Sequence, residues 1–412
     1  MGRLSNAWNQ FAAAPHRMFL WGGAAFGVVA VTLWTVEQLS LFTPLLTPVI
    51  WRVPPTPAHA LMMLYGLLGF YIFGFLLTTF PRWLEQAPIP RGIYESAWWC
   101  LAGGSLLWWI GLFRLPGAAA LGCLAWAAGY AIATAGCLRV LLAARGQPRE
   151  QQVAMCLGLA VAVVGLLAGA DFLWRGTPWA YRLARDGGLY GFLLLVILPV
   201  VYRMVPFFTS TVTPGYTLRR SAHGVPLLVA AALLRAGLTL AEQPQWLWLA
   251  DGALLVLLLR ELVVWRCWRV RGPALLLILY AAMGWFVLSF ALSTGESLGL
   301  LLGDAPYPLF GRAALHALVV GGFGNLLLGI STRVTLGHAG RGLATDRLVT
   351  TLFAVFQVVP LARIIPELLG RWLPAWAPHG FWAGFGWVLV FGLWLWHVGP
   401  LLWRARSDGQ PG

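Results

Sequence analysis

The residues best suited to chemistry in this 412-residue chain are its seven His, because imidazole nitrogen binds metal ions readily. His59 and His316 stand near the start of two different apolar segments, at the same predicted membrane depth. Two imidazoles from separate helices at one depth can bind haem iron as its axial ligands. No His-His, His-x-x-His or His-x-x-x-His spacing occurs, so the chain carries no local metal motif. A simpler interpretation, in which the His residues merely lie at membrane interfaces, stays open.

A second polar group follows within the apolar segment of His316. Residues 321–324 include three Gly, which would let a flat group or another helix lie against the backbone. Arg333, His338 and Arg341 place positive charge and hydrogen-bond donors at the other end of that segment. They can hold an anionic group or anchor the helix to anionic lipid headgroups, and the residues themselves allow both interpretations.

Charged residues inside apolar segments are costly in a membrane, so each is a further candidate for function. Arg363 and Glu367 are four residues apart on one predicted helix and can pair for packing alone. The others have no partner visible in the sequence, namely Arg203, Arg235, Arg260, Asp171 and Asp251.

The composition identifies the elements that must position these residues. Hydrophobic residues make up 59% of the chain and charged residues 10%, too little charge for a soluble protein of this length. The formal net charge of +14 comes from 28 basic residues, all Arg, spread along the chain rather than clustered. This spread argues against a nucleic-acid partner. The five Cys form no Cys-x-x-Cys pair and are predicted to be small core residues.

A bilayer core about 30 Å thick needs about 20 apolar residues in a helix. The sequence predicts twelve such helices, at 18–37, 58–80, 93–113, 116–143, 151–174, 187–209, 224–241, 245–265, 273–294, 311–335, 347–369 and 379–401. The predicted fold is therefore an all-α, polytopic membrane bundle whose partner is the lipid bilayer. Residues 1–403 are expected to form a single transmembrane domain, and residues 404–412 a disordered cytoplasmic tail.

Orientation follows from the excess of Arg in cytoplasmic loops. With the N-terminus inside, sixteen Arg fall in inner segments and six in outer loops. Both termini are therefore predicted to be cytoplasmic. His59 and His316 then lie at the outer ends of their helices, and His16 and His338 at inner ends.

The chain resembles the NnrS family of twelve-span bacterial membrane proteins. The family pattern L-H-A-L-x-x-G-x-x-G is present at 315–324, and T-R-x-x-L-G-H-x-G-R at 332–341. Shorter matches support it, at Pro15-His16-Arg17, Gly74-Phe75-Leu76-Leu77-Thr78 before Pro81 and Trp83, and Arg203-x-x-Pro206-x-x-Thr209. The resemblance implies a haem- and copper-containing protein of the bacterial inner membrane, linked to nitric oxide metabolism and nitrosative-stress tolerance.

The chain departs from the family at the entry to the second span. Members show W-H-x-H-E-M there, whereas this chain has Ala58-His59-Ala60-Leu61-Met62-Met63. His59 remains, but Leu61 and Met62 replace a second His and a Glu. Copper needs several nitrogen or sulfur ligands, so its site is depleted, whereas haem requires only the retained His59 and His316.

The resemblance thus favours a haem-binding protein with His59 and His316 as iron ligands. Arg52 and Arg312, at the same depth, would hold the haem propionates through charge-assisted hydrogen bonds. His16 and His338, with Arg333 and Arg341 nearby, would form a second pair or hydrogen-bond one another. Whether the protein is an enzyme, a sensor or a protective binder is left open. The alternative is a small-solute or metal carrier without haem, whose pathway intramembrane Arg and Asp would line. A haem–copper oxidase subunit is excluded because adjacent His ligands are missing.

Overall fold

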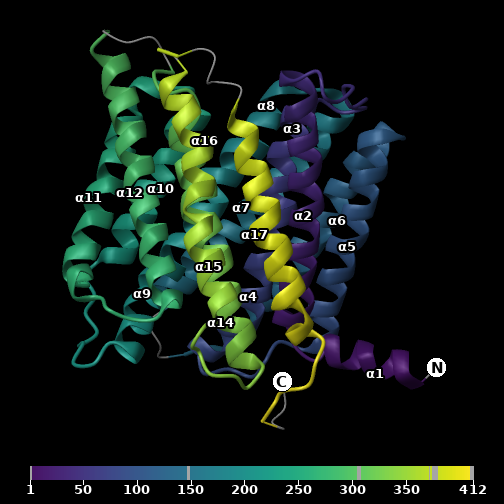
Figure 1. Ribbon diagram of the computed structural model, residues 1–412, viewed down its shortest axis with the longest axis vertical. Coiled ribbons are helices and arrows are strands. Elements are labelled where there is room, and N and C mark those ends of the chain that lie inside the picture. The colour runs from purple at the N-terminus through teal and green to yellow at the C-terminus, as the bar shows by residue number, and fades with distance from the viewer. Residues whose placement is uncertain (1, 146–148, 304–307, 371, 374–378, 409–412) are drawn as a thin grey trace.

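Every regular element in the part of the chain that the structure describes is helical (Figure 1). The computed structural model describes residues 2–145, 149–303, 308–370, 372–373 and 379–408. Its α-helices are α1 (Gly2–Phe11), α2 (Pro15–Phe42), α3 (Pro55–Leu61), α4 (Leu68–Trp83), α5 (Arg91–Phe113), α6 (Pro116–Ala143), α7 (Glu150–Arg175), α8 (Pro178–Arg182), α9 (Leu194–Val212), α10 (Gly224–Leu240), α11 (Leu247–Val264), α12 (Ala274–Leu301), α13 (Ala313–His316), α14 (Gly324–His338), α15 (Arg347–Phe356), α16 (Val358–Leu369) and α17 (Trp382–His397). The predicted all-α membrane bundle is confirmed.

Ten helical segments in the described residues are long and apolar enough to cross a membrane. Each of the twelve predicted ranges contains helix, and the two that fall outside the ten are α10 and α11. Helix α10 has 17 residues and includes Arg235. Helix α11 has 18 residues and carries Asp251, Arg260 and Glu261. Helix α10 therefore falls short in length and α11 carries three charged residues, and the charges in both helices need partners.

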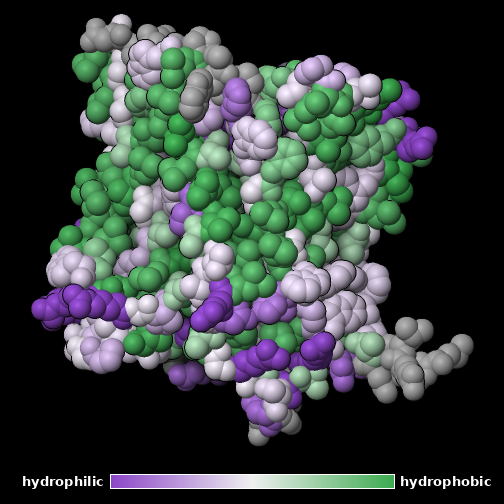
Figure 2. Space-filling model, in the orientation of Figure 1, coloured by the Kyte–Doolittle hydropathy of each residue, from purple (hydrophilic) through white to green (hydrophobic). Residues whose placement is uncertain are grey.

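Both ends of the chain lie at one end of the bundle, which we call the terminal end; the opposite end is the distal end (Figure 1). Helix α1 lies across the terminal end, while the long helices run between the two ends. Hydrophobic side chains cover the middle of the visible face, and hydrophilic ones gather at the terminal end (Figure 2). This distribution is the one expected of a multi-pass membrane protein.

Three of the long segments contain π-helical turns. These are η1 (Met62–Leu67), η2 (Leu183–Leu193) and η5 (Ala317–Phe323), which run directly into α4, α9 and α14. The Tyr65 hydroxyl in η1 donates a 2.7 Å hydrogen bond to the Ala184 carbonyl in η2. π-helical turns are rare and are frequent at functional sites. The sequence did not predict them, because their apolar pattern does not differ from that of an α-helix.

The segment 347–369 is broken in the middle, where Gln357 separates α15 from α16. Pro360 has no N–H to donate to the carbonyl four residues earlier, which accounts for the break. The Gln357 amide instead donates to the Asn325 side chain at 2.6 Å and accepts from the Trp285 indole at 3.2 Å. This polar network lies beside η5 and satisfies groups that the bilayer could not.

The Gly cluster at 321–324 brings aromatic side chains against the backbone. A β-carbon on Gly321 would lie 2.6 Å from the Trp285 ring, one on Gly324 would lie 2.7 Å from Phe356, and one on Gly322 would overlap the Phe286 ring. The predicted close approach is thus observed, and the flat groups that fill it are the protein's own aromatic rings.

The chain end is held against α14 as far as it is described. Ser407 donates from its backbone N–H and from its hydroxyl to the Ala339 carbonyl, both at 3.0 Å. The Arg404 carbonyl accepts from the Arg17 guanidinium at 2.8 Å. Residues 409–412 lie outside the described part of the chain, so the disordered tail at 404–412 stays a prediction.

Candidate functional site

His316 ends the short helix α13, just before the π-helical turns of η5. Its Nδ1 lies 2.9 Å from the backbone carbonyl of Arg312. A carbonyl oxygen can only accept, so Nδ1 carries the proton and Nε2 keeps its lone pair. A backbone carbonyl that fixes the tautomer in this way is the usual support for a metal-binding imidazole.

His59 lies on α3, directly before η1, and stacks on Trp34 of α2. The ring centroids are 4.0 Å apart and the planes differ by 14°. The Nδ1 atom of His59 is buried and has no hydrogen-bond partner among the described residues. Because the lone pairs of imidazole lie in the ring plane, stacking on a face leaves them accessible to a ligand. An unsatisfied buried nitrogen is costly, which indicates a missing partner.

The two imidazoles lie in one electrostatic neighbourhood at the distal end. His316 interacts electrostatically with His59, and both interact with Arg312 and Arg363. The structure therefore brings together the two His that the sequence singled out, on α3 and α13. It also adds Arg363 of α16, which sequence analysis treated only as a packing residue.

Arg363 forms the predicted pair with Glu367, with 2.7 Å between Nη2 and Oε1. Glu367 also accepts from the backbone N–H of Arg312 at 3.0 Å. It approaches Gly311, which has a φ of +57°, so closely that a β-carbon at Gly311 would collide with the carboxylate. Glu367 thus fixes the start of α13 and holds Arg363 near the imidazoles. The predicted depth of Arg363, near the outer end of its helix, was the signal that could have identified it.

Arg52 and Arg312, the predicted propionate partners, are both exposed at the distal end. Arg52 precedes α3, and its backbone N–H donates to the Leu112 carbonyl at 2.7 Å. Arg312 is the one of the two that interacts with both His59 and His316. The cationic groups that act on both imidazoles are therefore Arg312 and Arg363.

At the terminal end, His16 of α2 contacts His338 of α14. Their ring centroids are 4.2 Å apart with an interplanar angle of 33°. His16 is 1% exposed, and its backbone N–H donates to the Thr78 hydroxyl at 3.2 Å. The predicted proximity of the two His is observed. Rings in direct contact leave no room for a porphyrin between them, so this pair does not have the arrangement of two axial haem ligands.

Arginines surround the terminal pair without binding it directly. Arg17, Arg82 and Arg406 all interact electrostatically with both imidazoles. Arg333 lies over the Phe208 ring, with its guanidinium carbon 3.6 Å from the centroid. Arg341 is exposed. Neither Arg333 nor Arg341 is seen to contact the His16 or His338 ring among the described residues. Their cofactor role therefore stays a prediction.

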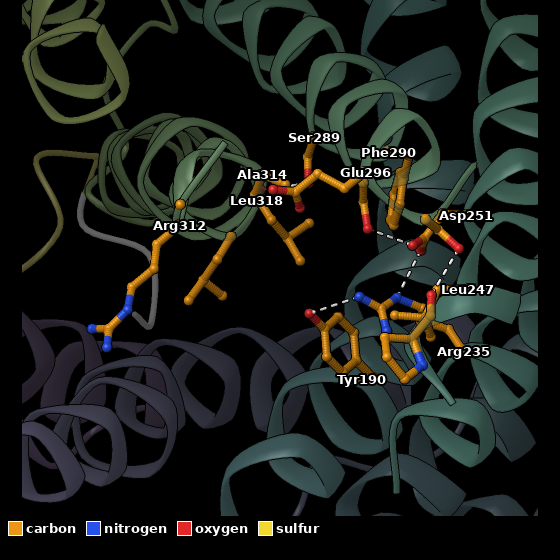
Figure 3. A pocket seen from close by; sticks show the side chains of 15 residues that line it. Tyr190, Arg235, Leu247, Asp251, Ser289, Phe290, Glu296, Arg312, Ala314 and Leu318 are labelled. Carbon is orange, nitrogen blue, oxygen red and sulfur yellow. Dashed lines mark hydrogen bonds and ion pairs between the residues drawn. The ribbon is translucent and has the colours of Figure 1, made fainter. Parts of the chain in front are cut away.

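A polar cavity of about 180 Å³ lies beside α13, toward the distal end (Figure 3). At its base Arg235 of α10 pairs with Asp251 of α11, with 2.8 Å between Nε and Oδ1. The side chains are 7% and 1% exposed. Neither residue has a partner that the sequence reveals, because residues on different helices have no spacing that indicates a contact.

The part of the chain that the structure describes contains no cluster of three or more His, Cys, Asp or Glu that could hold a metal ion. The family model described as NnrS protein matches residues 10–406, nearly the whole chain. No curated protein matches it.

Proposed function

Because the chain belongs to the NnrS family, we propose that it is a haem-binding protein of nitric oxide metabolism or of the response to nitrosative stress. In this proposal it resides in a bacterial inner membrane with both termini cytoplasmic, and the twelve helices form one transmembrane domain. His59 and His316 would hold the haem iron through their imidazole nitrogens.

The observation that carries the proposal is the pair of ring nitrogens left available at the distal end. His316 is held through Nδ1 and keeps Nε2, while His59 has a buried Nδ1 without a partner among the described residues. The rings come from different helices and interact electrostatically. This donor set suits the two-imidazole ligation of haem iron.

The surrounding residues have defined tasks in this proposal. The iron of a bound haem would supply electron transfer or binding of a small gas such as nitric oxide. Arg312 and Arg363 would hold the two propionate carboxylates through charge-assisted hydrogen bonds, with Arg52 as a further cation at the same end. Glu367 keeps Arg363 and the start of α13 in place. Trp34 fixes the plane of the His59 ring.

Copper is not part of the proposal. Leu61 and Met62, both fully buried, stand where the family pattern has a His and a Glu. The terminal pair His16 and His338 is assigned a structural role, since the two rings already contact one another.

An absorption spectrum of the purified protein tests the assignment. The wild type is expected to show a Soret band, and His59→Ala or His316→Ala should remove most of it. His397→Ala is the matched control, since His397 lies beside Asp346 at the terminal end and its loss should leave the spectrum unchanged. A colourless, folded wild type would refute haem binding. Flux of a small solute through proteoliposomes of that colourless protein would then favour a carrier.

A further inference from the structure

The polar cavity next to α13 has no task in the proposed haem site. It lies between η2, α10, α11 and α12, and its lining includes Tyr190, Arg235, Asp251, Ser293 and Glu296 (Figure 3). η2 and α12 belong to segments apolar enough to cross a membrane, and α10 and α11 pack against them. Polar groups at such a place are expensive and usually functional.

The base of the cavity is a buried ion pair with its own hydrogen-bond network. The Ser293 hydroxyl donates to Asp251 at 2.6 Å. The Arg235 guanidinium donates to the Tyr190 hydroxyl at 3.1 Å and to the Thr239 hydroxyl, and its carbon lies 4.1 Å from the Tyr190 ring centroid. Arg235 therefore has hydroxyl partners besides Asp251, and they would still hold the guanidinium if Asp251 became neutral.

Glu296 provides a second carboxylate nearer the distal end of α12. It is partly exposed and accepts from the backbone N–H of Phe310 at 2.7 Å. It interacts electrostatically with both Arg235 and Asp251. The cavity thus connects a carboxylate that reaches solvent with one that is fully buried.

The lining offers hydrogen-bond acceptors to water and protons. Two carboxylates share the cavity with the guanidinium groups of Arg235 and Arg312. The Ser289 hydroxyl donates to a backbone carbonyl and its oxygen is left as an acceptor, whereas the Ser297 oxygen already accepts from the Trp248 N–H. Arg312 lies at the opposite side of the cavity from Asp251 (Figure 3). A polar cavity of about 180 Å³ can hold several water molecules, since each occupies about 30 Å³ in the liquid. Water among acceptor groups is a route for protons.

We propose that the cavity is a proton-exchange site between the distal surface and Asp251. Glu296 takes a proton from solvent and passes it through cavity water to the Asp251 carboxylate, which becomes a neutral acid as a new O–H bond forms. Glu296 returns to its ionised state and takes the next proton from solvent. Arg235 stays protonated and keeps its hydrogen bonds to Tyr190 and Thr239.

The ionisable groups that face the cavity in the described residues are Tyr190, Arg235, Asp251, Glu296 and Arg312. A purely structural role explains them less well, because a buried ion pair adds little stability over well-packed apolar residues of similar volume. The site does not depend on haem, so it can be tested on colourless protein.

Infrared difference spectroscopy of the protein in lipid vesicles, between acidic and neutral pH, measures the exchange directly. The wild type is expected to show a protonated-carboxyl C=O band that Asp251→Asn removes. Asp171→Asn is the matched control, because Asp171 pairs with Arg175 at the end of α7 and should leave the band unchanged. Glu296→Gln is expected to keep the band and to slow its hydrogen–deuterium exchange several-fold.

Ser293→Ala is a second variant that probes the same band if Asp251→Asn fails to fold. It removes one hydrogen bond to Asp251 and should shift the frequency of the same band without abolishing it. An unshifted band in Ser293→Ala, or an undiminished band in folded Asp251→Asn, would overturn the assignment to Asp251. Equal exchange rates in wild type and Glu296→Gln would overturn the route through Glu296.

Discussion

At the terminal end, His16 and His338 lie ring against ring, with 4.2 Å between their centroids. Of the arginines at this end, Arg17 donates to a backbone carbonyl, Arg333 lies over an aromatic ring and Arg406 pairs with Asp408. At the distal end, His59 and His316 come from α3 and α13 and retain ring nitrogens that no described residue occupies. The buried Nδ1 of His16 also has no hydrogen-bond partner among the described residues, so the two ends differ in ring contact. The terminal rings lie against one another and leave no space between them for a flat ligand, whereas the distal rings show no such contact with one another in the described part of the chain. The two ends therefore use His in different ways, in one case for packing and in the other for binding a ligand as proposed above.

The two ends also differ in backbone. Each distal His stands at the start of a π-helical stretch, His59 before η1 and His316 before η5. The helix α14 that carries His338 continues as regular α-helix to its end. π-helical turns change the register of a helix locally, so they set the direction of the side chains near them. The distal His are thus positioned by an irregular backbone. A helix that served only for packing would not need π-helical turns.

The largest expected effect is spectroscopic, and it compares the two pairs directly. His316→Ala should abolish most haem absorbance, because it removes one of two iron ligands. His338→Ala should retain it, because that ring lies against His16 at the opposite end of the bundle. The measurement is the Soret absorbance per mole of folded protein. Loss of absorbance in His338→Ala with retention in His316→Ala would reverse the assignment of the two ends.

The next effect concerns the distal backbone. Gly322→Ala in η5 would drive a methyl group into the buried Phe286 ring and should destabilise the protein by about 3 kcal/mol, toward the upper end for overpacking. Gly284→Ala on α12 is the control, since a β-carbon there meets nothing within 4 Å. Denaturation of both variants in detergent gives the comparison. Equal stability would show that η5 adapts easily and does not define the His316 position.

Much of this architecture was accessible from the sequence. The bilayer fixes how long an apolar helix must be, so every predicted span contains helix. Predicted depth placed His59 and His316 at one end and His16 and His338 at the other, and the family motifs selected these four from the seven His. A hydropathy profile does not predict how a helix is rotated about its own axis. The contact of Arg235 with Asp251 and the approach of Arg363 to the imidazoles depend on that rotation. The glycines at 321–324 predicted a close approach, but not that Trp285, Phe286 and Phe356 would fill it.

A smaller effect is expected from the arginine that ties the chain ends together. Arg17 is buried and donates to the carbonyls of Gln10 at 3.1 Å and Arg404 at 2.8 Å. Arg17→Gln should therefore cost about 2 kcal/mol, the contribution of a charged hydrogen bond. Arg139→Gln, an exposed position on α6, should cost nothing measurable. Chemical denaturation checks both, and equal stability would show that the terminal end does not rely on this tie.

The smallest effect lies at the start of α15, also at the terminal end. Asp346 caps this helix by accepting from the Val349 N–H at 2.9 Å, and it lies 2.6 Å from His397 Nε2. The Val349 bond, followed by the His397 bond, holds the pKa of Asp346 below its ordinary value of 3.8. The carboxylate therefore stabilises the fold above pH 3.8, and this stability is lost as the pH falls through the lower pKa of the folded state.

Asp346→Ala should cost about 1 kcal/mol at neutral pH, the usual contribution of an N-cap. Asp346→Asn retains a capping oxygen, so it should keep most of the stability at neutral pH while losing the acid dependence that this carboxylate contributes. Denaturation midpoints measured from neutral to acidic pH distinguish these outcomes. Identical pH profiles for wild type and Asp346→Asn would show that the charge at the cap is irrelevant. The terminal end would then be held by neutral hydrogen bonds and ring contacts, which would widen its contrast with the charged distal site.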